Sequence, residues 1–269
     1  MLAKAGAFLR RDFQTQSSYR LNFFMQVIGI LVSISIFYFI SQILGTAISP
    51  YMSRYGDIDY FHFALMGIAF YPFIGISANS LSESIHEYQH TGTLEVLFIS
   101  PTPILPLLLM STLWRYCWAT GETLFYLLTA AFLFQADLNW MGISSAFVVI
   151  LLTIFANMGL GLINASFVLV TKRVSPLARL TRVITNLLSG IYYPIEILPN
   201  WLQTFSYFLP ATYAFEALRQ TMLQGAKLSD IGLLLLPLIA FSLILLPIGL
   251  ISFHYAIRWA KTDGSLSQY

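Results

Sequence analysis

Charged residues are scarce in this 269-residue chain. Lysine, arginine, aspartate and glutamate together make up 10% of the residues, whereas 57% are hydrophobic. Because a soluble domain carries about 25% charged residues, this composition excludes a large soluble domain and predicts a polytopic membrane protein. Helices satisfy their own backbone hydrogen bonds in lipid. We therefore expect one all-α transmembrane domain over residues 1–269.

The chain has one cysteine and no phosphate-binding loop motif. The single cysteine, Cys117, excludes an intramolecular disulfide and a cysteine metal cluster. The chain has no G-x-x-x-x-G-K-[ST] segment, so an ATP-driven process would need ATP bound by a separate chain. A net charge of +2 without a basic run gives no indication of a nucleic-acid partner.

Long apolar stretches recur along the chain, and each is bounded by polar residues. A helix needs roughly twenty apolar residues to cross a bilayer. The pattern predicts six transmembrane helices, of which the third and fourth are longer than needed and the fifth is short. Their expected ranges are 22–45, 60–80, 104–134, 143–170, 180–195 and 231–257.

Lysine and arginine are distributed unevenly between the loops. If the N-terminus is cytoplasmic, most of them fall on the inner side, and only Arg54, Arg219 and Lys227 fall outside. Short cytoplasmic loops carry an excess of basic residues. We therefore expect both termini in the cytoplasm and a multi-pass protein of the cell membrane, most simply a prokaryotic inner membrane.

The first residues alternate between apolar and basic side chains. Phe8, Leu9 and Phe13 are interleaved with Arg10 and Arg11. This pattern is typical of a helix lying in the membrane interface. We expect an interfacial helix over residues 1–21, the alternative being a basic leader that only sets topology.

The expected inner loop 81–103 differs from the others because it has no lysine or arginine. It carries Glu83, Glu87 and Glu95 instead. Attraction to lipid headgroups does not explain an acidic inner loop, so a surface that faces another protein is the better interpretation. A solvated polar loop is the alternative.

This loop is long enough for two short helices. Ser82 is a suitable cap for the first, and Gly92 is a natural stop. A second helical turn over 93–98 would end before Pro101. We expect both short helices to face the cytoplasm.

A metal-site motif lies in the same loop. His86, Glu87 and His90 match H-E-x-x-H, in which two histidines four residues apart bind zinc and the glutamate acts as general base. A zinc site also needs a third ligand. On the expected topology only Glu122 or His254 could reach, so an intramembrane zinc metallopeptidase is an alternative function rather than the first choice.

Prolines and charges interrupt the chain before its last apolar stretch. Pro194, Pro199 and Pro210 each remove a backbone donor and disfavour a continuous helix. Residues 191–219 are therefore expected to form a re-entrant helical segment at the outer face. Tyr192, Tyr193 and Glu196 would lie near its opening.

Polar side chains within the expected spans are candidates for a substrate path. Glu122 lies in the third span, and Asn157 and Asn164 lie in the fourth, interleaved with Gly159 and Gly161. Polar residues in spans usually face protein or a water-filled cavity. Close helix packing is the alternative for the two asparagines.

Two segments resemble one protein family. Residues 87–101, Glu-Tyr-Gln-His-Thr-Gly-Thr-Leu-Glu-Val-Leu-Phe-Ile-Ser-Pro, resemble the first cytoplasmic loop of the type 2 ABC exporter permeases. Residues 190–219 resemble that family's other signature, with Tyr-Pro, Leu-Pro-x-Trp, Pro-x-Thr-Tyr-Ala and an arginine in order. Six spans and an interfacial N-terminal helix fit the same family.

The resemblance implies the membrane subunit of an ATP-driven exporter for a lipid-, glycan- or drug-like substrate. It implies two copies of a separate ABC ATPase that hold ATP and Mg, a second permease chain as homodimer or heterodimer, and surrounding membrane lipid. The chain itself would not be an enzyme, and a non-transporting scaffold is a further alternative. The implied ATPase-docking residues are Glu83, Glu87, His90, Gly92, Thr93, Leu94 and Glu95.

Overall fold

The computed structural model describes residues 2–18, 20–52, 58–173 and 175–262, and within them it contains helices and no strand. The prediction of an all-α fold is confirmed. The elements are α1 (Leu2–Ser18), α2 (Arg20–Met52), α3 (Tyr60–His90), α4 (Leu94–Ile99), α5 (Ile104–Leu133), η2 (Trp140–Gly142), α6 (Ile143–Thr171), α7 (Pro176–Leu188), η3 (Ile195–Ile197), α8 (Asn200–Ser206), α9 (Pro210–Gln224) and α10 (Gly232–Thr262).

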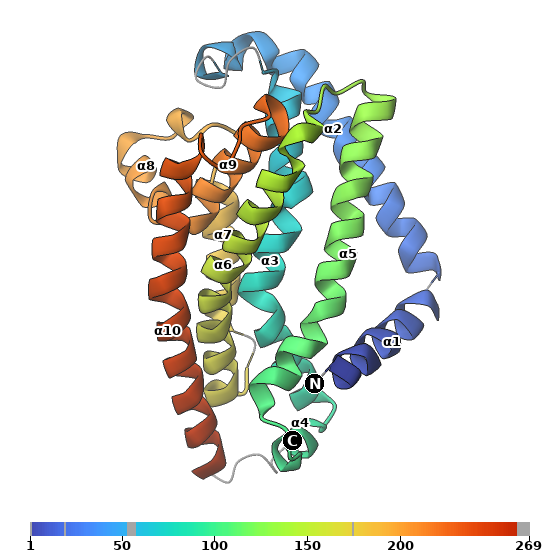
Figure 1. Ribbon diagram of the computed structural model, residues 1–269, viewed down its shortest axis with the longest axis vertical. Helices are drawn as coiled ribbons and strands as arrows, with labels where there is room; N and C mark the ends of the chain where they lie inside the picture. The colour runs from blue at the N-terminus through green and yellow to red at the C-terminus, as the bar shows by residue number, and fades with distance from the viewer. Residues whose placement is uncertain (1, 19, 53–57, 174, 263–269) are drawn as a thin grey trace.

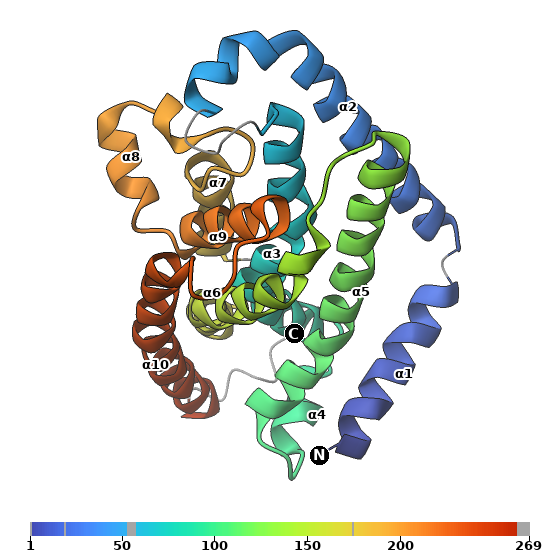
Figure 2. The same cartoon turned by 45° about the horizontal axis from the view of Figure 1, so that its top comes forward.

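The helices α3, α6 and α10 form the centre of the bundle, with α6 packed between the other two (Figure 1). The helix α5 packs on α3, and α1 packs on α5. The helix α2 lies on the side of α5 and α3, away from α10 (Figure 2). At one end of the bundle lie α1, α4 and the last turns of α10, and at the other lie α8 and α9.

Glycine allows α6 to approach both of its neighbours closely. A Cβ atom on Gly161 would lie 2.2 Å from the backbone oxygen of Ser77 in α3. A Cβ atom on Gly249 of α10 would lie 2.5 Å from the backbone oxygen of Gly159. Small residues that bring backbones together are the usual means of packing helices in membranes, where no hydrophobic effect drives association.

A buried amide reinforces the same contact. The Nδ2 atom of Asn164 donates a hydrogen bond to the backbone oxygen of Ala78, at 2.9 Å. The Nδ2 atom of Asn157 donates to the oxygen of Thr153 in its own helix, at 2.8 Å. Both asparagines are buried between helices, as the packing interpretation requires.

Four helical stretches are long and apolar enough to cross a membrane: Leu21–Leu44, Tyr60–His90, Trp140–Thr171 and Gly232–Thr262. They correspond to the predicted first, second, fourth and sixth spans. The third, α5, has 30 residues but is interrupted by Arg115 and Glu122. Four of the six predicted spans are thus confirmed as long apolar helices, and the third stays a prediction.

The predicted fifth span, 180–195, is not one helix. Helix α7 has 13 residues and ends at Leu188, which gives it a length of about 20 Å. The chain then turns at Ser189 and Gly190, whose φ of +74° is in the left-handed region where glycine is favoured. The break comes before Pro194 rather than after it, so the span was predicted too long.

The first of the two short helices predicted within residues 81–103 is not a separate element. Helix α3 continues without interruption to His90, so residues 81–90 are its last turns. Ser82 does not cap a helix, because its Oγ atom donates to the oxygen of Asn79 at 2.7 Å within α3. The second predicted helix is present as α4, and Gly92, with φ of +65°, lies in the turn between them.

We predict that Gly161→Ala lowers the free energy of unfolding by about 1–3 kcal/mol, because the new methyl group must displace the backbone of α3. The matched control is Gly29→Ala in α2, where a Cβ atom meets nothing within 4 Å. The measurement is the thermal unfolding midpoint of each purified variant in detergent. Equal midpoints for the two variants would contradict the close packing of α6 on α3.

Candidate functional site

The turn between α3 and α4 is fixed by backbone hydrogen bonds. Gly92 N–H donates to the oxygen of Gln89 at 3.1 Å, and Thr93 N–H donates to that of Tyr88 at 3.0 Å. Both bonds depend on the left-handed conformation of Gly92. Glycine is suited to this position because a residue with a side chain would be strained there. This turn sets the direction in which α4 leaves α3.

One buried leucine attaches α4 to the bundle. Leu94 is 2% exposed and packs in the cluster that contains Leu81 and Ile85 of α3. The opposite side of the helix is open, since Val96 is 68% and Ile99 is 83% exposed. The helix therefore presents two apolar side chains outward at the end of the molecule.

The predicted docking residues lie around this helix. On the last turns of α3, Glu83, Glu87 and His90 are exposed. Gly92 and Thr93 of the turn are exposed, and Glu95 is half-buried. All the predicted docking residues except Leu94 are thus accessible at the α3–α4 end.

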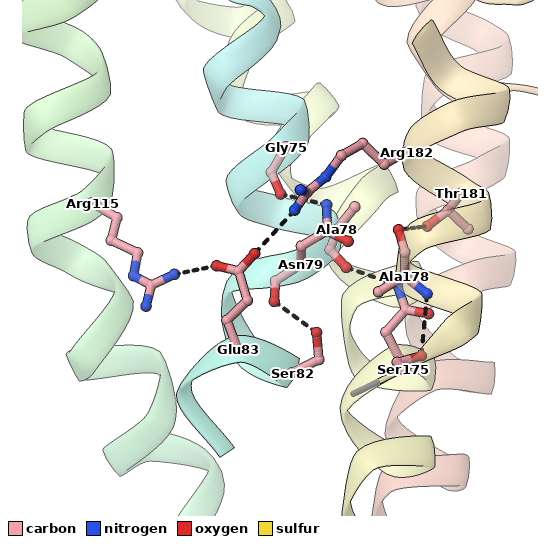
Figure 3. A network of polar contacts seen from close by, with 11 residues as sticks. Gly75, Ala78, Asn79, Ser82, Glu83, Arg115, Ser175, Ala178, Thr181 and Arg182 are labelled. Carbon is pink, nitrogen blue, oxygen red and sulfur yellow. Dashed lines mark hydrogen bonds and ion pairs between the residues drawn. The ribbon is translucent and has the colours of Figure 1, made fainter. Parts of the chain in front are cut away.

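Glu83 is held by ion pairs within the chain, as Figure 3 shows. One carboxylate oxygen lies 2.6 Å from Nη1 of Arg115 on α5, and the other lies 3.1 Å from Nη2 of Arg182 on α7. The family resemblance implied Glu83 as a docking residue. The structure gives Glu83 a role within the chain as well, because its ion pairs join α5 and α7 to α3.

A cleft of about 500 Å³ lies beside this ion-pair network, between the end of α3 and the start of α7. Its wall carries acidic and basic side chains, since His86 and Glu87 line it from α3 and Arg179 lines it from α7. The start of α7 is fixed by Ser175, whose Oγ accepts a hydrogen bond from Ala178 N–H at 3.1 Å. The N-terminus of α7 is thereby positioned against the α3–α4 end.

The H-E-x-x-H motif lies on the exposed last turns of α3. The rings of His86 and His90 are adjacent, with centroids 5.5 Å apart. Among the described residues, no group of three histidine, cysteine, aspartate or glutamate side chains could hold a metal ion. Neither Glu122 nor His254 supplies the third ligand, so the zinc-peptidase alternative gains no support from the geometry.

At the other end of the bundle, the guanidinium group of Arg219 is buried. Arg219 lies on α9, and it is 3% exposed. It donates to three backbone oxygens: those of Gly190 at 2.6 Å, Ile191 at 3.2 Å and Phe63 at 3.2 Å. Its guanidinium carbon also lies 3.4 Å from the centre of the Phe63 ring. The topology prediction counted Arg219 among the outer charges and did not foresee its burial.

These hydrogen bonds explain how the chain can break after α7. A buried backbone carbonyl without a donor costs free energy, and the break removes the helical donors of Gly190 and Ile191. Arg219 replaces them. The segment also lies directly against α3, since a Cβ atom on Gly67 would lie 2.2 Å from the oxygen of Ile191.

The predicted gate residues follow this break. Tyr192 stacks on Phe37 of α2, with ring centroids 5.7 Å apart and nearly parallel planes. The hydroxyl of Tyr193 donates to the oxygen of Leu187 at the end of α7. The backbone oxygen of Glu196 accepts from Nε2 of Gln203 on α8, at 3.4 Å. The segment is thus tied to α2, α7 and α8.

Glu122, the remaining predicted path residue, lies on a different helix, α5. It lines a cleft of about 490 Å³ between α2 and α5, together with aromatic side chains. It is half-buried. Asn157 and Asn164 lie in the packed interfaces of α6 described above, so the structure does not bring the three polar span residues together.

The sequence of residues 4–223 matches the family of ABC-2 type transporters. The chain belongs to this family. It is 31% identical over 113 residues to the linearmycin resistance permease protein LnrN of Bacillus subtilis (strain 168), an alignment that covers 42% of this chain and 29% of the relative. It is 36% identical over 74 residues to the ABC transporter G family member 20 of Dictyostelium discoideum, covering 28% of this chain and 10% of the relative. Each alignment thus spans under a third of the relative.

Sequence reasoning missed two features of this ABC-2 chain, the burial of Arg219 and the ion pairs of Glu83. A signal for the first exists, because Phe215, Leu218 and Met222 surround Arg219 at helical spacing and would be buried with it. No comparable signal exists for the second. Glu83, Arg115 and Arg182 are far apart in the sequence, and their pairing depends on how α5 and α7 pack on α3.

We predict a coupling energy of about 0.5–1 kcal/mol between Glu83 and Arg182, as expected for a partly exposed ion pair. It would be measured by a double-mutant cycle of Glu83→Gln and Arg182→Gln on the unfolding free energy. Arg179→Gln, one turn earlier on α7, is the matched control, since Arg179 makes no ion pair among the described residues. A coupling energy between Glu83 and Arg179 as large as that between Glu83 and Arg182 would contradict a specific ion pair of Glu83 with Arg182.

Proposed function

We propose that this chain is the membrane subunit of an ATP-driven exporter, and that a separate ABC ATPase binds at the α3–α4 end. The observation that carries the proposal is the exposed surface of α4 and its neighbours. It combines the apolar side chains of Val96 and Ile99 with the carboxylate of Glu87, at the end of the bundle where α1 begins and α10 ends.

The chemistry of this surface suits a protein rather than lipid headgroups. Residues 81–103 contain no lysine or arginine, whereas other segments at the same end are basic, among them Lys172, Arg173 and Lys261. Basic residues favour anionic headgroups and the cytoplasmic side. Two exposed apolar side chains beside carboxylates, held by one buried leucine, form a compact anchor for a partner with a hydrophobic pocket and basic rim.

The same charge distribution orients the molecule. The α3–α4 end, with its basic neighbours, the start of α1 and the end of α10, would face the cytoplasm, and α8 and α9 would face outward. The protein would then be a multi-pass component of a prokaryotic plasma membrane. ATP and Mg would be bound by the ATPase, outside this chain.

A second permease chain would complete the transport path, as homodimer or heterodimer, with one ATPase for each. Helices α2 and α10 carry many exposed large hydrophobic side chains, which only lipid or another membrane protein could cover. Membrane lipid is therefore a partner in any arrangement. An isologous interface between two copies would bring the same helices of each copy together.

For the substrate we infer a lipid-, glycan- or drug-like molecule moved outward. The name of the Bacillus relative, a resistance permease, favours the drug-like class among these three. The broken segment with Tyr192, Tyr193 and Glu196 lies at the proposed outer end, where a gate would be needed. Asn157, Asn164 and Glu122 stay candidates for contact with the substrate.

We predict that the double charge reversal Glu87→Lys with Glu95→Lys reduces copurification of the ATPase at least about tenfold, since two favourable charge contacts become repulsive. ATP-dependent transport should fall in parallel while membrane insertion is unchanged. The measurement is the amount of ATPase retained on the tagged permease, purified in mild detergent from the native host.

The control for this experiment is Asp59→Lys, a reversal of an exposed carboxylate immediately before α3, at the opposite end. It should leave copurification unchanged. Normal ATPase binding and transport in the Glu87/Glu95 double variant would refute docking at the α3–α4 end.

A further inference from the structure

A cleft lined mostly by apolar side chains lies between α2 and α5. These two helices lie on the side of the bundle away from α10 (Figure 2). The volume of the cleft is about 490 Å³, enough for a drug-sized molecule. A second hollow of about 380 Å³ continues from it towards α1 and shares Phe23, Trp114 and Trp118. The two hollows form one aromatic groove, which begins at α1 and extends along α2 and α5.

Glu122 places a carboxylate in the wall of this groove. It is half-buried and has no hydrogen-bond or ion-pair partner among the side chains that the structure describes. The basic residue nearest to it in the sequence of α5, Arg115, is occupied by its ion pair with Glu83 at 2.6 Å. Nothing described within the protein therefore neutralises Glu122.

A second polar group in the groove lacks a partner as well. The indole Nε1 atom of Trp118 is buried and has no acceptor in the structure. Buried polar groups are nearly always hydrogen-bonded, and each exception requires an explanation. The groove thus holds an uncompensated acceptor at Glu122 and an uncompensated donor at Trp118, four residues and one helical turn apart on α5.

Glu122 and the aromatic side chains around it together favour a positively charged ligand. A charged carboxylate in apolar surroundings is costly, so it either takes up a proton or pairs with a cation, and a lipophilic cation that binds beside it replaces the proton. Trp114, Trp118, Phe23 and Phe125 line the same groove, and aromatic rings attract cations through their π systems. An anionic lipid headgroup would be repelled by Glu122, and a neutral chain would leave the carboxylate uncompensated.

We propose that the groove between α2 and α5 binds lipophilic monovalent cations, organic amines or quaternary cations with an aromatic or alkyl body. The cationic centre pairs with Glu122 and lies against the tryptophans, while the body fills the apolar hollow towards α1. The argument for the binding site depends on the groove alone. The further step, that the bound cations are cargo taken up before export, rests on the function proposed above.

The test uses the permease alone, reconstituted in lipid nanodiscs, and tetraphenylphosphonium as the probe. Tetraphenylborate, of the same shape and opposite charge, is the matched ligand control. We expect saturable binding of the phosphonium to the wild type, and we expect Glu122→Gln to raise its Kd at least about tenfold through loss of the charge pair. An unchanged Kd in that variant would overturn the proposal.

The control variant is Glu216→Gln on α9, whose carboxylate accepts a hydrogen bond from Gln220 and lies outside the groove. It should bind the phosphonium like the wild type. If Glu122→Gln does not fold, Glu122→Asp and Trp118→Phe replace it. The first keeps the charge and should retain binding, and the second replaces the indole with a ring that attracts cations less strongly and should weaken it; the reverse order would overturn the assignment.

The site of binding is located by the chain's one cysteine. Cys117 is exposed and lines the groove. The phosphonium should slow its modification by a maleimide at least about fivefold at saturation, and the borate should not. Equal protection by both ions, or protection by neither, would contradict a cation site in this groove.

The binding result is independent of the ATPase. If the phosphonium binds but transport never depends on ATP, the proposed export function fails and the site stands. If transport is ATP-driven but Glu122→Gln binds the phosphonium normally, the site fails and the export function stands.

Discussion

The hydrogen bonds that Arg219 donates to backbone carbonyls make the broken part of this fold possible. After α7 the chain leaves the helix, and the oxygens of Gly190 and Ile191 are left in an apolar interior without helical donors. A guanidinium group has donors in a planar fork and can satisfy several carbonyls at once. Arg219 bonds both oxygens and that of Phe63, and it stacks on the Phe63 ring. One buried cation thus holds α9, the broken segment and α3 together.

Helix α3 connects the two ends of the molecule through such contacts. Near its start, Phe63 and Gly67 receive Arg219 and the oxygen of Ile191. In its middle, the glycine contacts of α6 hold it at backbone distance. Near its end, Glu83 pairs with α5 and α7, and the turn at Gly92 directs α4. A force applied to α4 would therefore act on a single continuous helix that also contacts the broken segment, which is the geometry that a coupled transporter needs.

The sequence predicted the parts of this fold that depend on local pattern. Uninterrupted apolar runs predicted the helices around 22–45, 60–80, 143–170 and 231–257, because hydrophobicity alone decides where such helices occur. Local pattern did not predict the length of α7, since the chain breaks where Arg219, distant in sequence, compensates the carbonyls. Local pattern also predicted Ser82 as a helix cap, which is wrong. The polar end of α3 continues as a helix because its inner face, with Leu81 and Ile85, is buried. In the candidate site, the exposed residues around α4 follow from the sequence, whereas the pairing of Glu83 depends on tertiary packing.

The most direct test of this account is hydrogen–deuterium exchange over residues 188–206 in Arg219→Gln, compared with Arg179→Gln, which removes an exposed arginine of α7. Local opening governs exchange. The account predicts exchange at least about tenfold faster in this segment for Arg219→Gln, with the contact between α6 and α10 unchanged, and wild-type exchange for Arg179→Gln. Exchange in Arg219→Gln equal to that of the wild type would contradict the claim that one buried arginine holds the broken segment in place.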